Sequence, residues 1–232
     1  MSPKNIREYK FYHLDVFAEK RFGGNPLAVF PNAEGLTVEE MQGIAFELNL
    51  SETAFIFPPE NPEAHHKIRI FTSIQELHFI GHPTIGAHYV LAHLGLINLN
   101  KNPTRIYQEV HNAILPVDIY LENSEIGKIT MTQKEPRFLD YIDDMEMLAH
   151  GLCCEVDDLD LEFASPRVVS TGMPCIMVPV KSTDVLGNMG LEVGYLREVC
   201  ERHGCEMAYA FTVRNTLRQH GACTVFQRPS VV

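Results

Sequence analysis

Residues 77–100 constrain the fold more than any other part of the sequence, because this stretch contains no Asp, Glu, Lys or Arg. Within it, residues 83–94 are apolar or small on nearly every side of a helix, and such a helix is enclosed by its fold rather than lying on the surface. A membrane span would also need an uncharged stretch, but Pro83, Asn98 and four histidines interrupt this one. The sequence therefore predicts a buried helix with other elements wrapped around it.

Short strands on both sides of this helix indicate a curved sheet as its wrapping. The apolar pattern predicts strands over residues 11–17, 25–30, 52–57 and 67–72, within residues 105–121, and over residues 128–131. A second helix is predicted over residues 37–49, where Thr37 and Glu40 have the spacing of a capping box.

The second half of the chain echoes this order. A strand is predicted over residues 175–180, a helix over residues 193–202, and strands over residues 208–213 and 222–226. In the first half the buried helix follows the strand that ends near Phe71, and its counterpart would begin beyond Val232. We therefore expect two lobes, residues 11–125 with a complete central helix and residues 126–232 without one.

Charge and composition narrow the range of partners. The formal net charge of −11 disfavours nucleic acid and anionic membranes, because a negative surface repels both. An apolar fraction of 45% and a charged fraction of 21% are ordinary for a globular protein. Residues 1–10 lack the apolar segment of a secretory signal. We therefore expect a cytoplasmic protein whose cysteines are reduced.

No metal or cofactor is expected. The six cysteines all lie from Cys153 onward, and their spacing is not that of paired zinc ligands. His78 and His82 are four residues apart, but Gly81 and Pro83 interrupt any helix that would bring them onto one face. The sequence also lacks a glycine-rich nucleotide-binding motif after a strand.

The start of the buried helix has the composition of an anion site. Pro83 suits the first helical position, and Gly81 allows backbone to approach a ligand. Free N–H groups and the helix dipole would then favour a carboxylate. The alternative is that these residues form only a turn into the helix. Position at a buried helix end singles out His82 among the histidines.

Glu52 is the best candidate for acid–base chemistry. It lies where the helix over residues 37–49 gives way to a strand. A Glu at such a place is ordinarily a solvated loop residue. A general acid/base would need partial burial, for example beside Phe55 or Phe57, so that its proton affinity suits the reaction.

Four segments, in this order, together resemble the PhzF family, related to diaminopimelate epimerase. They are Asp15-Val16-Phe17 with Gly24-Asn25-Pro26-Leu27-Ala28-Val29, then Leu50-Ser51-Glu52-Thr53-Ala54-Phe55, then Arg69-Ile70-Phe71-Thr72 with Glu76-Leu77, and then Gly81-His82-Pro83-Thr84-Ile85-Gly86. The resemblance is firm over residues 11–95 and looser over residues 168–232. It implies an α+β, two-lobed diaminopimelate epimerase-like fold in which each lobe wraps a sheet around a central helix.

The resemblance also implies an activity, that of a cofactor-independent isomerase moving a proton on a small carboxylic acid. Glu52 would shuttle the proton as general acid/base, and His82 would line the pocket and assist. Gly81, Asn25 and Ser51 would bind substrate. The family resemblance further implies a homodimer. The related epimerases use two Cys, and the matching regions here hold no Cys.

One family segment has no match. After Phe226-Gln227-Arg228-Pro229 the family has a Glu-Asp-Pro-x-Thr-Gly segment that supplies a catalytic-site Asp, and this sequence lacks it. Two alternatives therefore stay open. Besides an isomerase, these are a truncated, catalytically incomplete protein or a binding protein with this fold, and an epimerase or racemase that uses Glu52 and a second base.

Overall fold

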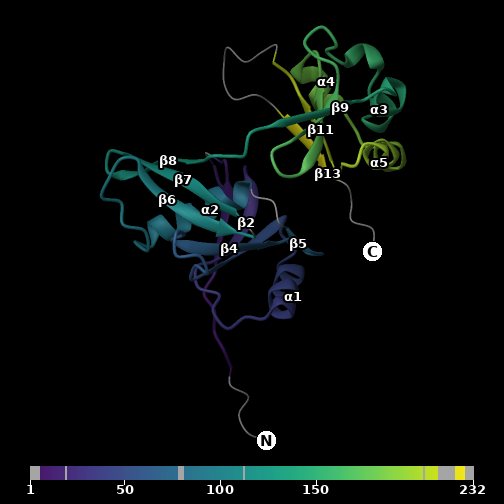
Figure 1. Cartoon of the computed structure of the whole chain (residues 1–232). Coiled ribbons are helices and arrows are strands. Elements are labelled where there is room, and N and C mark those ends of the chain that lie inside the picture. Colours follow the sequence, from purple (N-terminus) through teal and green to yellow (C-terminus); the bar gives the residue numbers. More distant parts are fainter. Residues whose placement is uncertain are drawn as a thin grey trace, which may run out of the picture. The chain divides into compact units, whose positions relative to one another are not determined.

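A computed structural model describes residues 6–18, 20–77, 81–111, 113–205, 207–213 and, for the backbone alone, 223–227. The chain forms two compact units, one up to Gln133 and the other from Lys134 (Figure 1). The boundary between the two lobes was predicted from the sequence to lie between residues 125 and 126. In the structure the strand β8 (Glu125–Met131) pairs with the preceding strand β7 (Ala113–Glu122) and lies in the first unit.

The first unit is an eight-stranded mixed sheet with two helices. Its other strands are β1 (Tyr12–Val16), β2 (Asn25–Phe30), β3 (Glu52–Phe57), β4 (His66–Phe71), β5 (Glu76–Leu77) and β6 (Thr104–Val110). The sheet order is β1-β2-β3-β4-β6-β7-β8, and β5 pairs with β4. The β2–β3 and β4–β6 pairs are parallel and the others are antiparallel.

Helix α2 (His82–His93) lies inside the curl of this sheet, as Figure 1 shows. It contacts β1, at one end of the sheet order, and β8, at the other. Its residues Ala87, Val90 and Leu91 share one core cluster with side chains from β1, β2, β3, β4 and β6. The prediction of an enclosed helix is therefore confirmed, with Tyr89 as a side chain that reaches solvent.

Helix α1 (Val38–Leu48) covers the opposite face of the sheet (Figure 1). Thr37 accepts a hydrogen bond from Glu40 N, and the Glu40 carboxylate accepts one from Thr37 N, which confirms the capping box. Beneath the helix, the rings of Phe30 and Phe55 stack with centroids 4.9 Å apart. These rings belong to a second core layer, which packs β2 and β3 against α1.

The second unit repeats the strand pairing of the first. Its strands are β9 (Arg137–Tyr141), β10 (Arg167–Ser170), β11 (Pro174–Pro179), β12 (Met207–Phe211) and β13 (Cys223–Gln227), in the order β13-β12-β11-β10-β9. The pairs β10–β11, β11–β12 and β12–β13 are antiparallel, parallel and antiparallel, as are β1–β2, β2–β3 and β3–β4. The internal echo in the sequence is thus a repeat of topology.

Helices α3 (Met145–Gly151), α4 (Thr183–Asn188) and α5 (Val193–Arg202) pack against the sheet of this unit, and a 3-10 turn spans Val156–Asp158. Their side chains, among them Leu148, Leu186 and Leu196, form the core together with Ile176 and Val178 of β11. The expected absence of a central helix from residues 126–232 stays a prediction.

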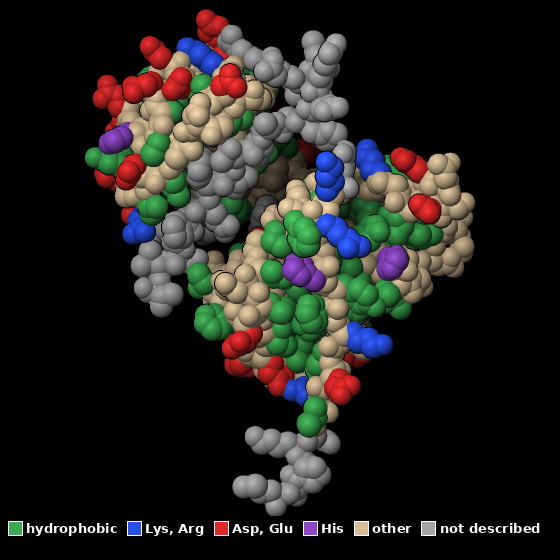
Figure 2. Space-filling model, turned by 180° about the vertical axis from the view of Figure 1, so that it is seen from behind, with side chains coloured by type: hydrophobic (Ala, Val, Ile, Leu, Met, Phe, Trp, Pro, Cys, Tyr) green, Lys and Arg blue, Asp and Glu red, His purple; other side chains and the backbone are tan. Residues whose placement is uncertain are grey.

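Surface charge and helix length are the two features that concern nucleic acid and membranes as partners. Acidic side chains gather on the second unit (Figure 2), in line with the net charge of −11, and the absence of a nucleic acid partner stays a prediction. None of the helices in the described part of the chain is long and apolar enough to cross a membrane.

Candidate functional site

The five candidate residues of the sequence analysis come together at one end of the first unit. Strands β2 and β3 are parallel, and Leu27 pairs with Glu52. Asn25 at the start of β2 therefore lies at the same edge of the sheet as Ser51 and Glu52. The enclosed helix α2 begins at this edge, with Gly81 as its N-cap and His82 as its first residue.

The Glu52 carboxylate and the His82 imidazole face each other. Glu52 Oε2 lies 2.9 Å from His82 Nε2, and the two side chains are only 14% and 9% exposed. The two groups are within ion-pair distance but are not aligned as a hydrogen bond. Neither atom has a hydrogen-bond partner among the described residues. Glu52 is therefore not the solvated loop residue of the alternative interpretation.

The other ring nitrogen of His82 is contacted by an amide. Asn25 Nδ2 lies 3.0 Å from His82 Nδ1. Ser51 Oγ lies 3.3 Å from Asn25 Oδ1 and 2.9 Å from the carbonyl oxygen of Pro26. Asn25 and Ser51 are exposed, unlike the His82 and Glu52 side chains.

The backbone at the start of α2 offers fewer free N–H donors than the sequence suggested. Pro83 has no N–H, and Thr84 N donates to the Gly81 carbonyl at 3.1 Å. At most the amides of Gly81 and His82 are left for a ligand in this turn. A carboxylate at this helix end would therefore depend on side chains as well as on the helix dipole.

A close approach of the backbone fixes the segment before Asn25. A Cβ on Gly24 would lie 2.4 Å from the carbonyl oxygen of Val16 and 2.8 Å from the Cβ of Ala18, so only glycine fits. The Asp15 carboxylate accepts a hydrogen bond of 2.7 Å from Phe22 N across the same loop. Close packing thus requires glycine at position 24. The backbone path that this glycine allows places Asn25 next to His82.

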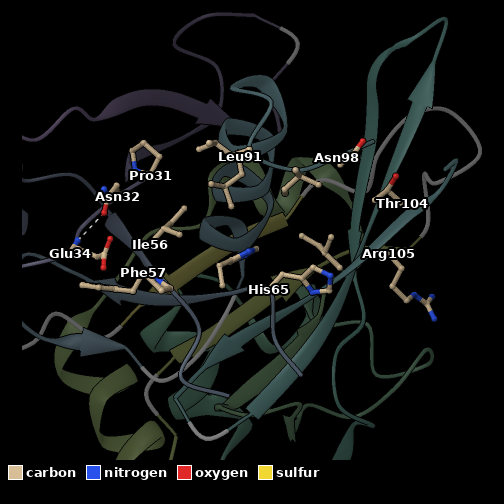
Figure 3. A pocket seen from close by; sticks show the side chains of 15 residues that line it. Pro31, Asn32, Glu34, Ile56, Phe57, His65, Leu91, Asn98, Thr104 and Arg105 are labelled. Carbon is tan, nitrogen blue, oxygen red and sulfur yellow. Dashed lines mark hydrogen bonds between the residues drawn. The ribbon is translucent and has the colours of Figure 1, made fainter. Parts of the chain in front are cut away.

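A cavity of about 570 Å³, which the sequence did not predict, lies in this unit (Figure 3). Its lining includes Ile56 and Phe57 of β3, Leu91 of α2 and Asn98 after it, and none of the five site residues. Figure 3 shows Arg105 pointing away from this cavity, and that side chain forms two hydrogen bonds of 2.7 Å with Asp118.

A buried histidine pair adjoins the cavity. His66 lines it, and His66 Nε2 lies 3.0 Å from His88 Nε2. His88 Nδ1 donates to the Thr84 carbonyl at 2.7 Å, so His66 is the donor within the pair. Burial lowers the pKa of His66 to about 4 and that of His88 to about 3, because an uncompensated charge is costly there.

Metal binding has no support from the described residues, among which no three His, Cys, Asp or Glu side chains are arranged to hold an ion. His78, which the sequence analysis considered for a metal, lies outside the described residues. Contact between His66 and His88 could not be predicted from their spacing, because it depends on how α2 is rotated against β4.

Comparisons with known proteins agree on one family. The model of the phenazine biosynthesis-like proteins, PhzC–PhzF, matches residues 14–223. An uncharacterised isomerase of Clostridium acetobutylicum is 40% identical over 210 residues, which cover 90% of this chain and 68% of that protein. The trans-2,3-dihydro-3-hydroxyanthranilate isomerase of Pseudomonas chlororaphis is 32% identical over 164 residues, covering 70% of this chain and 56% of that enzyme.

Solved structures agree with the predicted fold. A PhzF-family phenazine biosynthesis protein of Bacillus anthracis has a TM-score of 0.80 at 30% identity, covering 96% of this chain and 73% of that one. A probable proline racemase of Agrobacterium radiobacter has a TM-score of 0.59 at 12% identity, covering 93% of this chain and 69% of that one, which shows the fold alone. The α+β, diaminopimelate epimerase-like fold is thereby confirmed.

Proposed function

The chain belongs to the phenazine biosynthesis-like (PhzC–PhzF) family, and from this premise we propose that it is a cofactor-independent isomerase that moves a proton on a small carboxylic acid. The Clostridium acetobutylicum and Pseudomonas chlororaphis relatives are isomerases by name, as a family of isomerases requires. The chain spans 68% and 66% of the length of two of its relatives, so the activity of this chain is itself part of the proposal.

One observation carries the proposal. Glu52 Oε2 and His82 Nε2 lie 2.9 Å apart at the enclosed start of α2, and neither has a hydrogen-bond partner among the described residues. Buried polar atoms without partners are uncommon, and they mark places where a ligand supplies the missing contacts. A carboxylate oxygen and an imidazole nitrogen are therefore both available to a substrate.

Both of these atoms take part in the proposed reaction. The Glu52 carboxylate takes a proton from an activated carbon, and the electron pair left behind delocalises toward an unsaturated neighbour of that carbon. The same carboxyl returns the proton at another carbon, so substrate and product have the same atoms. His82 Nε2, as a hydrogen-bond donor, stabilises the negative charge that develops in between.

The class of substrate follows from this chemistry and from the relatives. Proton removal from carbon requires an adjoining group that accepts the electron pair. The relative from Pseudomonas chlororaphis is named an isomerase of trans-2,3-dihydro-3-hydroxyanthranilate, an unsaturated cyclic amino acid. We therefore propose a small unsaturated carboxylic acid as substrate. The homodimer and the cytoplasmic location stay predictions.

Isotope exchange tests the proposal. Unsaturated carboxylic acids of this class, including trans-2,3-dihydro-3-hydroxyanthranilate, are incubated with the protein in deuterated water, and deuterium uptake at carbon is followed by NMR. Glu52→Gln keeps the shape of the side chain but cannot take up a proton, so exchange should fall by roughly 10²–10⁴-fold. Glu47→Gln, on the exposed face of α1, is the matched control and should exchange like the wild type. Equal exchange by wild type and Glu52→Gln would overturn the assignment.

The same experiment separates the two alternatives. An epimerase or racemase would place deuterium on a stereocentre with inversion, and its wild-type protein would convert one enantiomer into the other. A binding protein would show substrate binding by calorimetry with no exchange in wild type or variant. The binding-protein alternative is tested because the chain covers only part of the length of its relatives.

A further inference from the structure

We propose that Asn25 and Ser51 act on the reaction through His82, by holding its imidazole in the tautomer whose proton is on Nε2. This role rests on the proposed function of Glu52 and His82. It differs from the expectation of the sequence analysis, in which Asn25 and Ser51 bind substrate. Both would be positioning residues.

The contacts around the carboxamide of Asn25 carry the argument. Its nitrogen lies 3.0 Å from His82 Nδ1, and an amide nitrogen has only protons to offer. His82 Nδ1 must therefore be the unprotonated, accepting nitrogen. In a neutral imidazole the remaining proton is then on Nε2, the atom that faces Glu52.

Ser51 determines which way round the carboxamide lies. Its hydroxyl is 3.3 Å from Asn25 Oδ1 and 2.9 Å from the carbonyl oxygen of Pro26, and the one proton is shared between these acceptors. Pro26 is the second residue of β2, so the hydroxyl is anchored to sheet backbone. A donor at this place favours the amide oxygen on the Ser51 side and the amide nitrogen on the His82 side.

The tautomer matters because of what Nε2 faces. With a proton, Nε2 presents a donor beside Glu52 Oε2 and toward the substrate. Without one, it would present a lone pair to the lone pairs of the carboxylate at 2.9 Å, which is repulsive. It would also have no proton with which to stabilise negative charge on a substrate.

NMR of the imidazole nitrogens tests this without any substrate. Protein carrying ¹⁵N-labelled histidine is examined at a pH of about 8, above the usual titration range of histidine. In the wild type, His82 should show a proton on Nε2 and an unprotonated Nδ1. In Asn25→Asp, the new carboxylate can only accept, so Nδ1 should gain a proton. In Ser51→Ala, where the carboxamide is free to turn, we expect a mixture of the two tautomers.

A matched control makes the same chemical change elsewhere. Asn32→Asp alters a residue whose Oδ1 accepts from Glu34 N, outside the site, and should leave the His82 nitrogens unchanged. Asn25 and Ser51 are exposed, so their variants should keep the wild-type circular dichroism and urea midpoint. A wild-type His82 with its proton on Nδ1, or the same spectrum from Asn25→Asp and Asn32→Asp, would overturn the proposal.

Steady-state kinetics, with a substrate on which the protein catalyses deuterium exchange, provide a second test. A positioning residue acts on the reacting state, so Asn25→Ala should lower kcat with KM changed less than about threefold. A substrate ligand would instead raise KM at nearly constant kcat, and this result would restore the earlier expectation. The outcomes stay separable, since failure of the Glu52→Gln exchange test leaves the measured tautomer intact, and an Nδ1-protonated His82 leaves that exchange test intact.

Discussion

At the scale of single residues, the site depends on side chains that are held between the sheet and the end of a helix. Glu52 is the first residue of β3 and pairs with Leu27, which is fully buried. His82 is the first residue of α2, whose next two residues, Pro83 and Thr84, are buried. The two side chains are only 14% and 9% exposed, so the surrounding atoms limit how far either functional group can move.

The buried pair of His66 and His88 should make stability depend on pH. Both pKa values are lowered by burial, to about 4 and about 3, so between these values and about 6.5 the unfolded chain binds more protons than the folded one. The stabilising contribution is complete above about pH 6.5 and is lost as the pH falls toward about 4. Urea unfolding at pH 7.5 and pH 5 should differ by about 4 kcal/mol from this pair, about 2 kcal/mol for each imidazole.

Variants measure how much of this pH dependence of stability comes from His66 and His88. In the double variant His66→Gln/His88→Gln, whatever its stability, the loss between pH 7.5 and pH 5 should be smaller than in the wild type. His13→Gln, on the exposed surface of β1, should show the wild-type loss. An unchanged pH dependence in the double variant would mean that the two imidazoles bind protons equally well in the folded and the unfolded chain.

At the scale of elements, helix α2 combines two requirements. It must pack closely enough for the sheet to curl around it, and its first residue must reach the sheet edge where Glu52 lies. Gly86 shows how close the packing is, since a Cβ there would lie 2.5 Å from Leu27 Cδ2 and 2.9 Å from Val16 Cγ2. The position of His82 is thus coupled to the packing of the helix as a whole.

Two glycine-to-alanine substitutions should act with opposite signs. Gly86→Ala forces buried side chains of β1 and β2 to move, which costs about 1–3 kcal/mol and outweighs the better helix propensity of alanine. Gly43→Ala, in α1, meets nothing within 4 Å, so propensity alone should stabilise the protein by about 0.5–1 kcal/mol. Urea unfolding measures both. Stabilisation by Gly86→Ala would show that the sheet does not hold α2 as closely as described.

Elements with a strong local pattern were predictable from the sequence, and those without one were not. The capping box at Thr37 and the uncharged helix after Gly81 were read correctly, because cap spacing and lack of charge are local signals. Strand β9 was missed because all five of its residues are exposed and show no alternation. Helix α3 was missed because its seven residues are too few for a clear helical period.

The candidate site divides in the same way. Glu52 and His82 were singled out by motif and by their places at element ends, and the structure brings them within 2.9 Å. The contact between Asn25 and His82 joins residues 57 positions apart. No spacing rule yields such a contact, since it depends on the curl of the sheet and on the backbone approach at Gly24. The roles of these residues stay proposals.

At the scale of the whole molecule, the first unit holds its own core. Its three buried clusters draw only on residues up to Gln133, and the five site residues lie within the same limits. The second unit has a separate cluster, built from residues beyond that point. Each unit therefore has what an independently folding domain requires.

A fragment of residues 1–133 should fold by itself. We expect a cooperative urea transition followed by circular dichroism, since the helix and the sheet around it are complete. Gly86→Ala should destabilise the fragment and the full chain by the same amount, because every close neighbour of that position lies in the fragment. A fragment without a cooperative transition would show that the first unit needs the rest of the chain.

The confinement of all five site residues to one unit has a consequence for protein engineering. A chimera that joins residues 1–133 to the remaining part of a different PhzF-family relative would keep all five proposed site residues and the contacts between them. A library of such hybrids would show how far reactivity and choice of substrate are inherited separately.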